Sequence, residues 1–94
     1  MREEIKKISN GSGMLQFSAS WCGPCKVLTK TINDNEDKLT NVKRLCVDLD
    51  SYQDIGAEFG IRSIPTLILF KDGKEVKRTV GSKTIEQLLE FIGE

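Results

Sequence analysis

Two cysteines stand two residues apart in the segment Trp21-Cys22-Gly23-Pro24-Cys25, the part of the sequence with the clearest chemistry. Thiols at this spacing near the start of a helix can transfer electrons by forming and breaking one disulfide bond. The same spacing also occurs in half of a zinc site. The neighbouring residues must therefore distinguish a redox pair from a metal-binding pair.

A redox role requires one thiol to attack and the other to resolve. The attacking species is a thiolate, and an ordinary cysteine, with a pKa of about 8.5, is mostly protonated at neutral pH. Free backbone N–H groups and the helix dipole would stabilise a negative charge on Cys22 at a helix start. Gly23 allows another backbone to approach, and Pro24 suits a first helical turn. Cys25, one turn further, can attack the mixed disulfide of Cys22, so Cys22 is assigned as nucleophile and Cys25 as resolving thiol.

A zinc site is the alternative for the same pair. The chain has no histidine and only one further cysteine, Cys46, so it cannot supply four cysteine or histidine ligands by itself. Carboxylates or a second chain would have to complete the site. We therefore expect a redox pair and no metal.

The composition excludes several classes of protein. Fourteen basic side chains balance fourteen acidic ones over 94 residues, so no strong field attracts nucleic acid or an anionic membrane. Residues 1–8 are charged where a secretory signal is apolar, and no later segment has the length and apolarity of a membrane span. We expect a soluble, cytoplasmic and monomeric protein with a single domain over residues 1–94.

The spacing of apolar residues predicts the elements that position the cysteines. Helical spacing recurs in four segments, over residues 1–8, 26–33, 52–59 and 84–92. Strand patterns occur in four others, at 14–18, 42–49, 66–70 and 75–80. This order predicts an α/β fold with a βαβαββα core after a short N-terminal helix. Its four-stranded mixed sheet has parallel strands first, an antiparallel hairpin last, and helices on both faces.

Local signals predict how several elements begin and end. Asp50 and Ser51 are expected to cap the third helix, which ends at Gly60 in a left-handed conformation. The segment Lys71-Asp72-Gly73-Lys74 predicts a hairpin turn, and Thr84-Ile85-Glu86-Gln87 predicts a capping box.

The strands at 42–49 and 75–80 are expected to differ in burial. The strand at 42–49 has the apolar pattern of a buried strand. The strand at 75–80 is expected at an edge, where Lys77 and Arg78 discourage association while Val76 and Val80 face the core.

The chain from Met14 onward resembles the thioredoxin family. The matching motifs occur in the family's order: Phe17-Ser18-Ala19-Ser20-Trp21-Cys22-Gly23-Pro24-Cys25-Lys26, Val47-Asp48-Leu49-Asp50, Phe59-Gly60-Ile61-Arg62-Ser63-Ile64-Pro65-Thr66, Lys71-Asp72-Gly73 and Val80-Gly81. The resemblance implies the thioredoxin fold and a protein-disulfide reductase. It also implies disulfide-containing substrate proteins and recharging by a thioredoxin reductase that uses NADPH, with no cofactor bound to this chain.

The resemblance also implies a substrate-binding rim around the cysteines. In the family the bond equivalent to Ile64-Pro65 is cis and lies beside the cysteines, and the backbone of Ile64 would pair with an extended substrate segment. The implied rim consists of Trp21, Gly23, Pro24, Ile64, Pro65 and Gly81. Two members have structural alternatives: Trp21 as a half-buried packing residue and Gly81 as a turn glycine that needs positive φ.

Three features depart from the family pattern. Gln16 stands where typical members have a buried aspartate that exchanges protons with the resolving cysteine, and Cys46 replaces the lysine that commonly partners it. We therefore regard Gln16 and Cys46 as the positions that tune the pKa of the thiols, with water or the departing thiolate deprotonating Cys25. Cys46 is expected to be a small buried hydrophobe, with a third redox thiol as the alternative.

The chain also begins after the family's first strand, although residues 5–8 could pair as a fifth strand.

Other functions remain open for the same fold. One is an interaction or accessory module that docks through its apolar rim, although the presence of both cysteines argues against it. The others are a glutaredoxin-like reductase and an oxidase or isomerase. Residues between the cysteines tune the redox potential by small margins, since ~30 mV corresponds to only ~1.4 kcal/mol.

Overall fold

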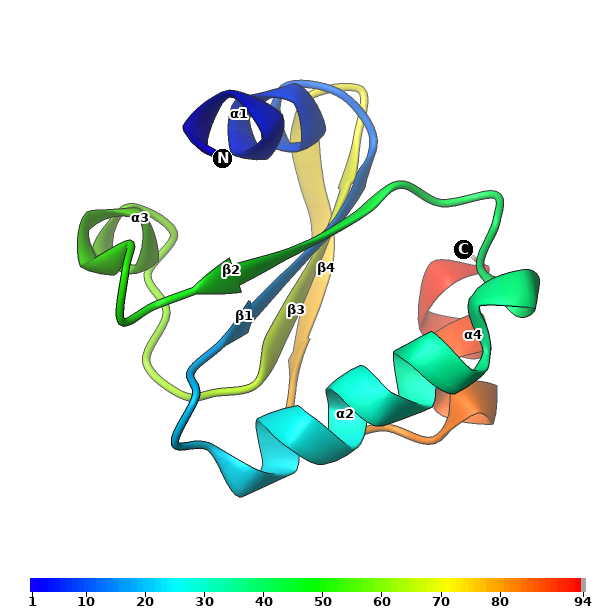
Figure 1. Ribbon diagram of the computed structural model, residues 1–94. Coiled ribbons are helices and arrows are strands. Elements are labelled where there is room, and N and C mark those ends of the chain that lie inside the picture. Colours follow the sequence, from blue (N-terminus) through cyan, green and yellow to red (C-terminus); the bar gives the residue numbers. More distant parts are fainter. Residues whose placement is uncertain (94) are drawn as a thin grey trace.

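The computed structural model describes residues 1–93, in which helices alternate with strands along most of the chain (Figure 1). The elements, in chain order, are α1 (Arg2–Ser9), β1 (Gly13–Ser18), α2 (Gly23–Asp34), the 3₁₀ helix η1 (Glu36–Lys38), β2 (Arg44–Asp48), α3 (Gln53–Glu58), β3 (Thr66–Lys71), β4 (Lys74–Val80) and α4 (Ile85–Ile92). Each predicted helix and strand is present. The N-terminal segment is a helix and does not pair as a fifth strand.

The strands form one mixed sheet in the order β2-β1-β3-β4. β1 pairs with β2 in parallel, whereas β3 is antiparallel to both of its neighbours. β1 and β3 are central, which agrees with the continuous apolar sequence of β3. This arrangement confirms the predicted parallel pair and final antiparallel hairpin.

Helices cover both faces of the sheet because β1 and β3 bury alternate side chains on opposite sides. Leu15, Phe17 and Ile68 pack on the α1 and α3 side, together with Ile5 and Ile55 from those helices. A second cluster on the side of α2 and α4 contains Met14, Leu28, Ile32, Leu67, Leu69 and Leu88. The end of β1 leads directly into the segment that carries the cysteines, so this core fixes their position (Figure 1).

The prediction of a buried strand at residues 42–49 is wrong in part. β2 is an edge strand, and Val47 is its only buried residue. Cys46 is exposed, so the prediction that it is a small buried hydrophobe is also wrong. Its side chain lies on the face that α2 covers only partly, and its Sγ is 3.1 Å from the Ser18 hydroxyl oxygen. An apolar sequence pattern does not show whether a neighbouring strand covers the edge.

β4 is the other edge strand, as predicted, but its valines do not face the core. Val76 is 47% exposed and Val80 is 51% exposed. Lys77 and Thr79 are the partly buried residues of β4 instead, and Lys77 lies over the ring of Phe91. A register shift between Leu69 and Phe70 accompanies the pairing of β3 with β4, and the sequence contains no signal for it.

The helix and turn signals are confirmed with one exception. Gly60 has φ +66°, the hairpin turn places Asp72 and Gly73 at positive φ, and Thr84 forms the predicted capping box with Gln87. Asp50 and Ser51, however, do not cap α3, which begins after Tyr52 without a side-chain cap. The Asp48 carboxylate closes this turn by accepting the Asp50 N–H at 2.9 Å.

Candidate functional site

Cys22 and Cys25 are joined by a disulfide bond at the start of α2. Cys22 is the N-cap residue in an extended conformation, and its Sγ accepts the backbone N–H of Cys25 at 3.2 Å. Pro24 lies in the first turn, where a missing N–H leaves no helical bond unmade. The predicted helix start therefore directs one backbone donor, the N–H of Cys25, at the sulfur of Cys22.

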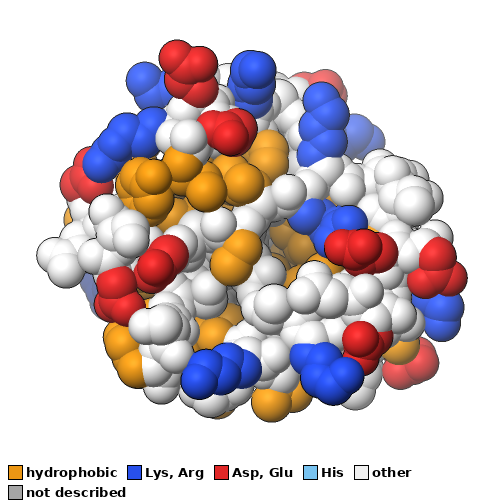
Figure 2. All heavy atoms as spheres, viewed as in Figure 1, with side chains coloured by type: hydrophobic (Ala, Val, Ile, Leu, Met, Phe, Trp, Pro, Cys, Tyr) orange, Lys and Arg blue, Asp and Glu red, His pale blue; other side chains and the backbone are white. Residues whose placement is uncertain are grey.

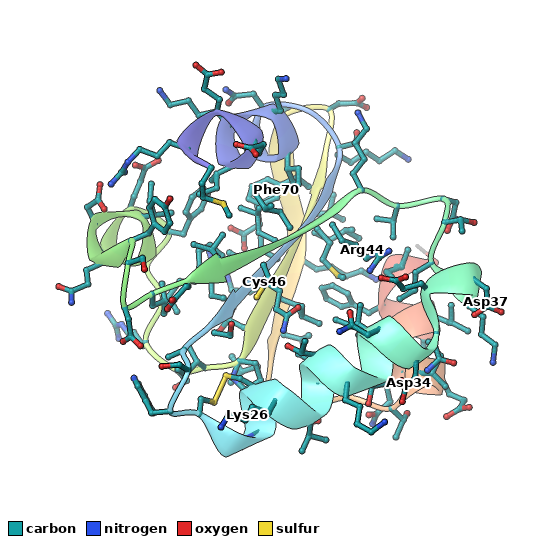
Figure 3. The ribbon with its side chains drawn as sticks, viewed as in Figure 1. Lys26, Asp34, Asp37, Arg44, Cys46 and Phe70 are labelled. Carbon is teal, nitrogen blue, oxygen red and sulfur yellow. A yellow bond between two sulfur atoms is a disulfide. The ribbon has the colours of Figure 1, made fainter. Side chains whose placement is uncertain are left out.

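The disulfide lies in a small hydrophobic cluster beside exposed residues. Cys22 is 5% exposed and Cys25 is 2% exposed, and both pack with Ala19 and the partly buried Ile64. In contrast, Gly23 and Pro24 are exposed beside them. Figure 3 shows the disulfide as a yellow bond at the N-terminal end of α2, next to Lys26. The two sulfur-bearing residues are thus buried next to exposed residues of the same segment.

The start of β3 and the end of β4 complete the other side of this rim. The Ile64-Pro65 bond is cis, as expected. Gly81 has φ +98°, which fits the alternative of a turn glycine. It also lies beside Pro65, because its N–H donates to the Pro65 carbonyl at 2.8 Å. Ile64 contacts the cysteine cluster. Residues 39 or more positions from the cysteines in the sequence are therefore brought next to them.

Trp21 is 70% exposed, which excludes the alternative that it is a half-buried packing residue. Its Nε1 donates to one oxygen of Asp50 at 3.2 Å, and the Ser20 hydroxyl donates to the other oxygen at 3.3 Å. Sequence reasoning missed Asp50 as a site residue, because it assigned that side chain to a helix cap. The signal for its position was that it follows β2, which is parallel to β1 and ends at the same edge of the sheet.

Gln16 lies behind the disulfide on β1 and is 6% exposed. Its Nε2 donates to the Thr29 hydroxyl at 2.9 Å, a partner on α2 that the sequence analysis did not identify. Thr29 follows Cys25 by four residues, so helical spacing could have indicated it. The amide thus occupies a buried position with a neutral hydrogen-bond partner and introduces no charge there.

Two openings reach the region behind the cysteines. A groove of about 370 Å³ runs along α2 from Cys25 to Asp34, with Thr29 in its wall. A smaller cavity of about 120 Å³ is lined by Gln16, Thr29 and Cys46, among others. The groove therefore gives solvent a path to Cys25.

At the far end of this groove, the Asp34 carboxylate accepts a hydrogen bond from Lys30 at 2.7 Å, and this contact raises the pKa of Lys30.

The described part of the chain has neither a cluster of metal ligands nor a membrane-spanning helix. Within residues 1–93, His, Cys, Asp and Glu side chains form no group of three or more that could hold a metal ion. Over the same residues, each helix is too short or too polar to cross a membrane.

Comparison with known proteins gives a consistent result over nearly the whole chain. The family model "Thioredoxin" matches residues 1–94. Thioredoxin of Chlamydia trachomatis is 46% identical over 85 residues, which cover 90% of this chain and 83% of that protein. Thioredoxin of Chlamydia caviae is 42% identical over 87 residues, which cover 93% and 85%.

Solved structures with the same fold include two thioredoxins. Thioredoxin NaTrxh from Nicotiana alata superposes with a TM-score of 0.79 at 38% identity, covering 96% of this chain and 78% of that one. Oxidised mitochondrial thioredoxin 3 from Saccharomyces cerevisiae superposes with a TM-score of 0.85 at 26% identity, covering 98% and 88%. These matches confirm the fold that the sequence motifs implied.

Proposed function

This chain belongs to the thioredoxin family and is a thiol–disulfide oxidoreductase, and we propose that Cys22 attacks disulfides of substrate proteins while Cys25 resolves the intermediate. The observation that carries these roles is the position of Cys22 at the N-cap of α2, with the Cys25 N–H directed at its sulfur. A backbone donor and the helix dipole favour negative charge on Cys22 in the reduced protein. Cys25 lies deeper, where an incoming protein disulfide has less access.

The reaction transfers two electrons through one mixed disulfide. The Cys22 thiolate attacks one sulfur of the substrate disulfide, which forms a Cys22–substrate bond and releases the other substrate sulfur as a thiolate. Cys25 then loses its proton and attacks the Cys22 sulfur, which releases the second substrate thiolate. Both substrate thiolates take up protons, and the chain is left with the Cys22–Cys25 disulfide.

Proton removal from Cys25 distinguishes this chain from an aspartate-bearing relative. Gln16 has no carboxylate to accept a proton, and its amide is occupied by Thr29. Two other proton acceptors are available to Cys25. One is water that enters the groove along α2, and the other is the departing substrate thiolate. Resolution of the mixed disulfide is therefore expected to depend on solvent access along α2.

Substrate binding is assigned to the exposed rim. Trp21, Gly23 and Pro24 surround the attacking thiol, and Ile64, Pro65 and Gly81 form the opposite side. An extended substrate segment can pair with the backbone at Ile64 by β-augmentation. Asp50 supports this rim by holding the indole of Trp21.

The partners follow from the same chemistry. The oxidised chain needs an external dithiol donor, and we assign this role to a thioredoxin reductase that uses NADPH, with no cofactor bound to the chain itself. Disulfide-containing proteins are the substrates. We further propose that residues 1–94 act as one domain in the cytoplasm.

An insulin-reduction assay with dithiothreitol as donor tests the assignment. The wild-type chain should accelerate insulin precipitation, Cys22→Ser should abolish the acceleration, and Cys25→Ser should accumulate a covalent adduct with insulin. Cys46→Ser is the matched control, because it also removes one thiol but lies on β2. An adduct that forms through Cys25 in the Cys22→Ser variant would reverse the two roles, and failure of the wild type would reject the reductase function.

A further inference from the structure

The hydroxyl group of Thr29 is a hydrogen-bond donor that its own helix does not use. Its oxygen accepts the Nε2–H of Gln16 at 2.9 Å, so its own proton is directed elsewhere. A threonine inside a helix can donate to the carbonyl four residues earlier, as Thr31 does to Val27 at 3.1 Å. Among residues 1–93, Thr29 makes no such bond to the Cys25 carbonyl. The described chain therefore offers this proton no acceptor.

Helix geometry places the hydroxyl close to the resolving thiol. Residues four apart lie on the same side of a helix, and a helical side chain leans toward the preceding turn. Thr29 therefore leans toward Cys25, and both residues line the groove of about 370 Å³ along α2. In the disulfide form the Cys25 sulfur carries no charge and accepts no hydrogen bond from Thr29. A water molecule that enters the groove can bridge such a separation in the reduced protein.

We propose that Thr29 is a positioning residue for the resolving step: its hydroxyl, oriented by Gln16, holds a groove water that donates a hydrogen bond to the Cys25 thiolate. This role rests on the assignment of Cys25 as the resolving thiol in the proposed function. Cys25 must lose its proton before it attacks the Cys22 sulfur, and a hydrogen bond to the thiolate favours that loss. The proton still leaves to water or to the departing substrate thiolate.

Gln16 makes the hydroxyl a stronger and better directed donor. An amide N–H that donates to the Thr29 oxygen polarises the O–H bond, and hydrogen bonds that point the same way along a chain strengthen one another. Gln16 is 6% exposed, so solvent screens this effect little. A carboxylate at position 16 would instead accept the Thr29 proton and direct it inward. The amide and the hydroxyl thus form a neutral donor pair that favours negative charge on Cys25 without a buried base.

Few titratable groups lie close to Cys25. Its packing partners are Cys22, which titrates, and Ala19 and Ile64, which do not. β1 contributes only uncharged side chains. The titration of Cys25 is therefore coupled most closely to that of Cys22, and a measurement on Cys25 alone requires Cys22 to be replaced.

The remaining charged groups lie further out, on α2 and β2. The openings on either side of Thr29 are lined by five charged or titratable side chains: Lys26, Lys30, Asp34, Arg44 and Cys46. In Figure 2, basic and acidic side chains lie together at the surface over α2. Variants at position 29 are compared in one background, so the influence of these groups on Cys25 cancels.

Titration of Cys25 alone provides the test. The full chain with Cys22→Ser and Cys46→Ser has Cys25 as its only thiol. Its rate of alkylation by iodoacetamide, measured against pH, reports the fraction of thiolate. Thr29→Val replaces the hydroxyl by a methyl group and should raise the midpoint by about one pH unit, because the thiolate loses a donor. Thr29→Ser keeps the hydroxyl and should retain the lower midpoint.

Thr31→Val is the matched control. It makes the same substitution two residues away on α2, but the Thr31 hydroxyl already donates to Val27. Its midpoint should equal that of the background chain. Equal midpoints for Thr29→Val and Thr31→Val would overturn the role of Thr29, and so would a Thr29→Ser midpoint as high as that of Thr29→Val.

A second pair of variants tests Gln16 as the residue that orients the hydroxyl. Gln16→Met removes the amide at similar length and should raise the midpoint less than Thr29→Val does. The double variant should match Thr29→Val, because Gln16 acts only through the hydroxyl. It leaves no buried donor unpaired, so it replaces Thr29→Val if that variant does not fold. A further rise in the double variant would show that Gln16 acts on Cys25 independently.

This titration is distinguishable from a failure of the reductase function, because the midpoint is measured without a protein substrate. Activity gives a separate readout in the chain with all three cysteines. In single-turnover reduction of insulin by the pre-reduced chain, Thr29→Val should slow the second step about tenfold at pH 7 and less at higher pH. A slowing that is the same at every pH would mean that Thr29 is only structural.

Discussion

At the scale of single residues, Gln16 places an amide where the resemblance to the thioredoxin family implies a buried aspartate. It is buried, neutral and hydrogen-bonded to Thr29, while Cys25 lines a groove that is open at the surface. A carboxylate at this position could accept a proton directly, whereas an amide can only donate and accept hydrogen bonds. The rate at which Cys25 resolves the mixed disulfide should therefore respond to this one side chain.

Gln16→Asp is predicted to raise turnover at neutral pH by up to about tenfold, less than the ~10² of many general bases because solvent already serves Cys25. The pH profile should gain an inflection from the new carboxyl group, measured as insulin-reduction rate against pH. Gln16→Asn is the control, since it changes side-chain length in the same way without adding a base. An unchanged rate and profile in Gln16→Asp would contradict a proton-handling role for this position.

Asp50 is predicted to act on substrate binding through Trp21. Asp50→Ala removes the acceptor of the indole N–H, so the exposed ring loses its fixed orientation. We expect KM for a protein disulfide to rise about threefold with kcat nearly unchanged, in steady-state assays with the donor held constant. Ser20→Ala removes the other hydrogen bond of Asp50 and should have little effect. A fall in kcat alone would show that Asp50 acts on the chemistry instead.

At the scale of elements, α4 shows how a short helix obtains a defined start. The Thr84 hydroxyl accepts the Gln87 N–H at 3.2 Å, and the Gln87 side chain accepts the Thr84 N–H at 2.9 Å. These reciprocal bonds satisfy two backbone donors that a helix start leaves free. Leu88 can then be buried against the sheet at the correct angle.

Thr84→Ala is predicted to lower the free energy of unfolding by about 1 kcal/mol, which corresponds to about 5 °C in Tm for a domain of this size. Thermal unfolding followed by circular dichroism measures the change. Ser82→Ala, two residues earlier and exposed, is the control and should shift Tm by less than about 2 °C. Equal shifts in both variants would mean that the cap does not stabilise α4.

At the scale of the whole molecule, the Arg2 and Asp54 side chains join α1 to α3 across 52 residues of sequence. The guanidinium donates to both carboxylate oxygens, at 2.7 and 3.1 Å, and lies over the ring of Tyr52. This contact holds the pKa of Asp54 below its ordinary value, chiefly through the hydrogen bond from Arg2. Arg2 thereby links the two helices that cover the same face of the sheet.

A lowered pKa in the folded state makes the contribution of Asp54 depend on pH. The stabilisation is fully present above the ordinary pKa of an aspartate, about 3.8, and is lost as the pH falls through the lowered value. Asp54→Asn should therefore lower Tm at pH 7 and have no effect once the wild-type carboxyl is protonated. Asp37→Asn, an exposed aspartate, is the control. A Tm difference for Asp54→Asn that stays constant from pH 7 to pH 2 would contradict this linkage.

Much of the fold could be predicted from sequence because its signals are local. Apolar spacing located each helix and strand, and the capping box at Thr84 and the turn at Asp72 and Gly73 follow from backbone geometry that neighbouring residues impose. The same holds for the cysteine pair, since both thiols lie within one helical turn. The predicted order of elements was then sufficient for the mixed sheet.

The sequence by itself thus determined the fold, the redox pair and the neutral residue behind it. Tertiary structure alone decided what depends on neighbours distant along the chain: Asp50 holds Trp21, Thr29 holds Gln16, and Gly81 bonds to Pro65. It also decided that Cys46 is exposed and that β2 is an edge strand of the sheet that residues 1–93 form. Periodicity reports which face of a strand is apolar, but whether another strand covers its edge depends on the complete sheet.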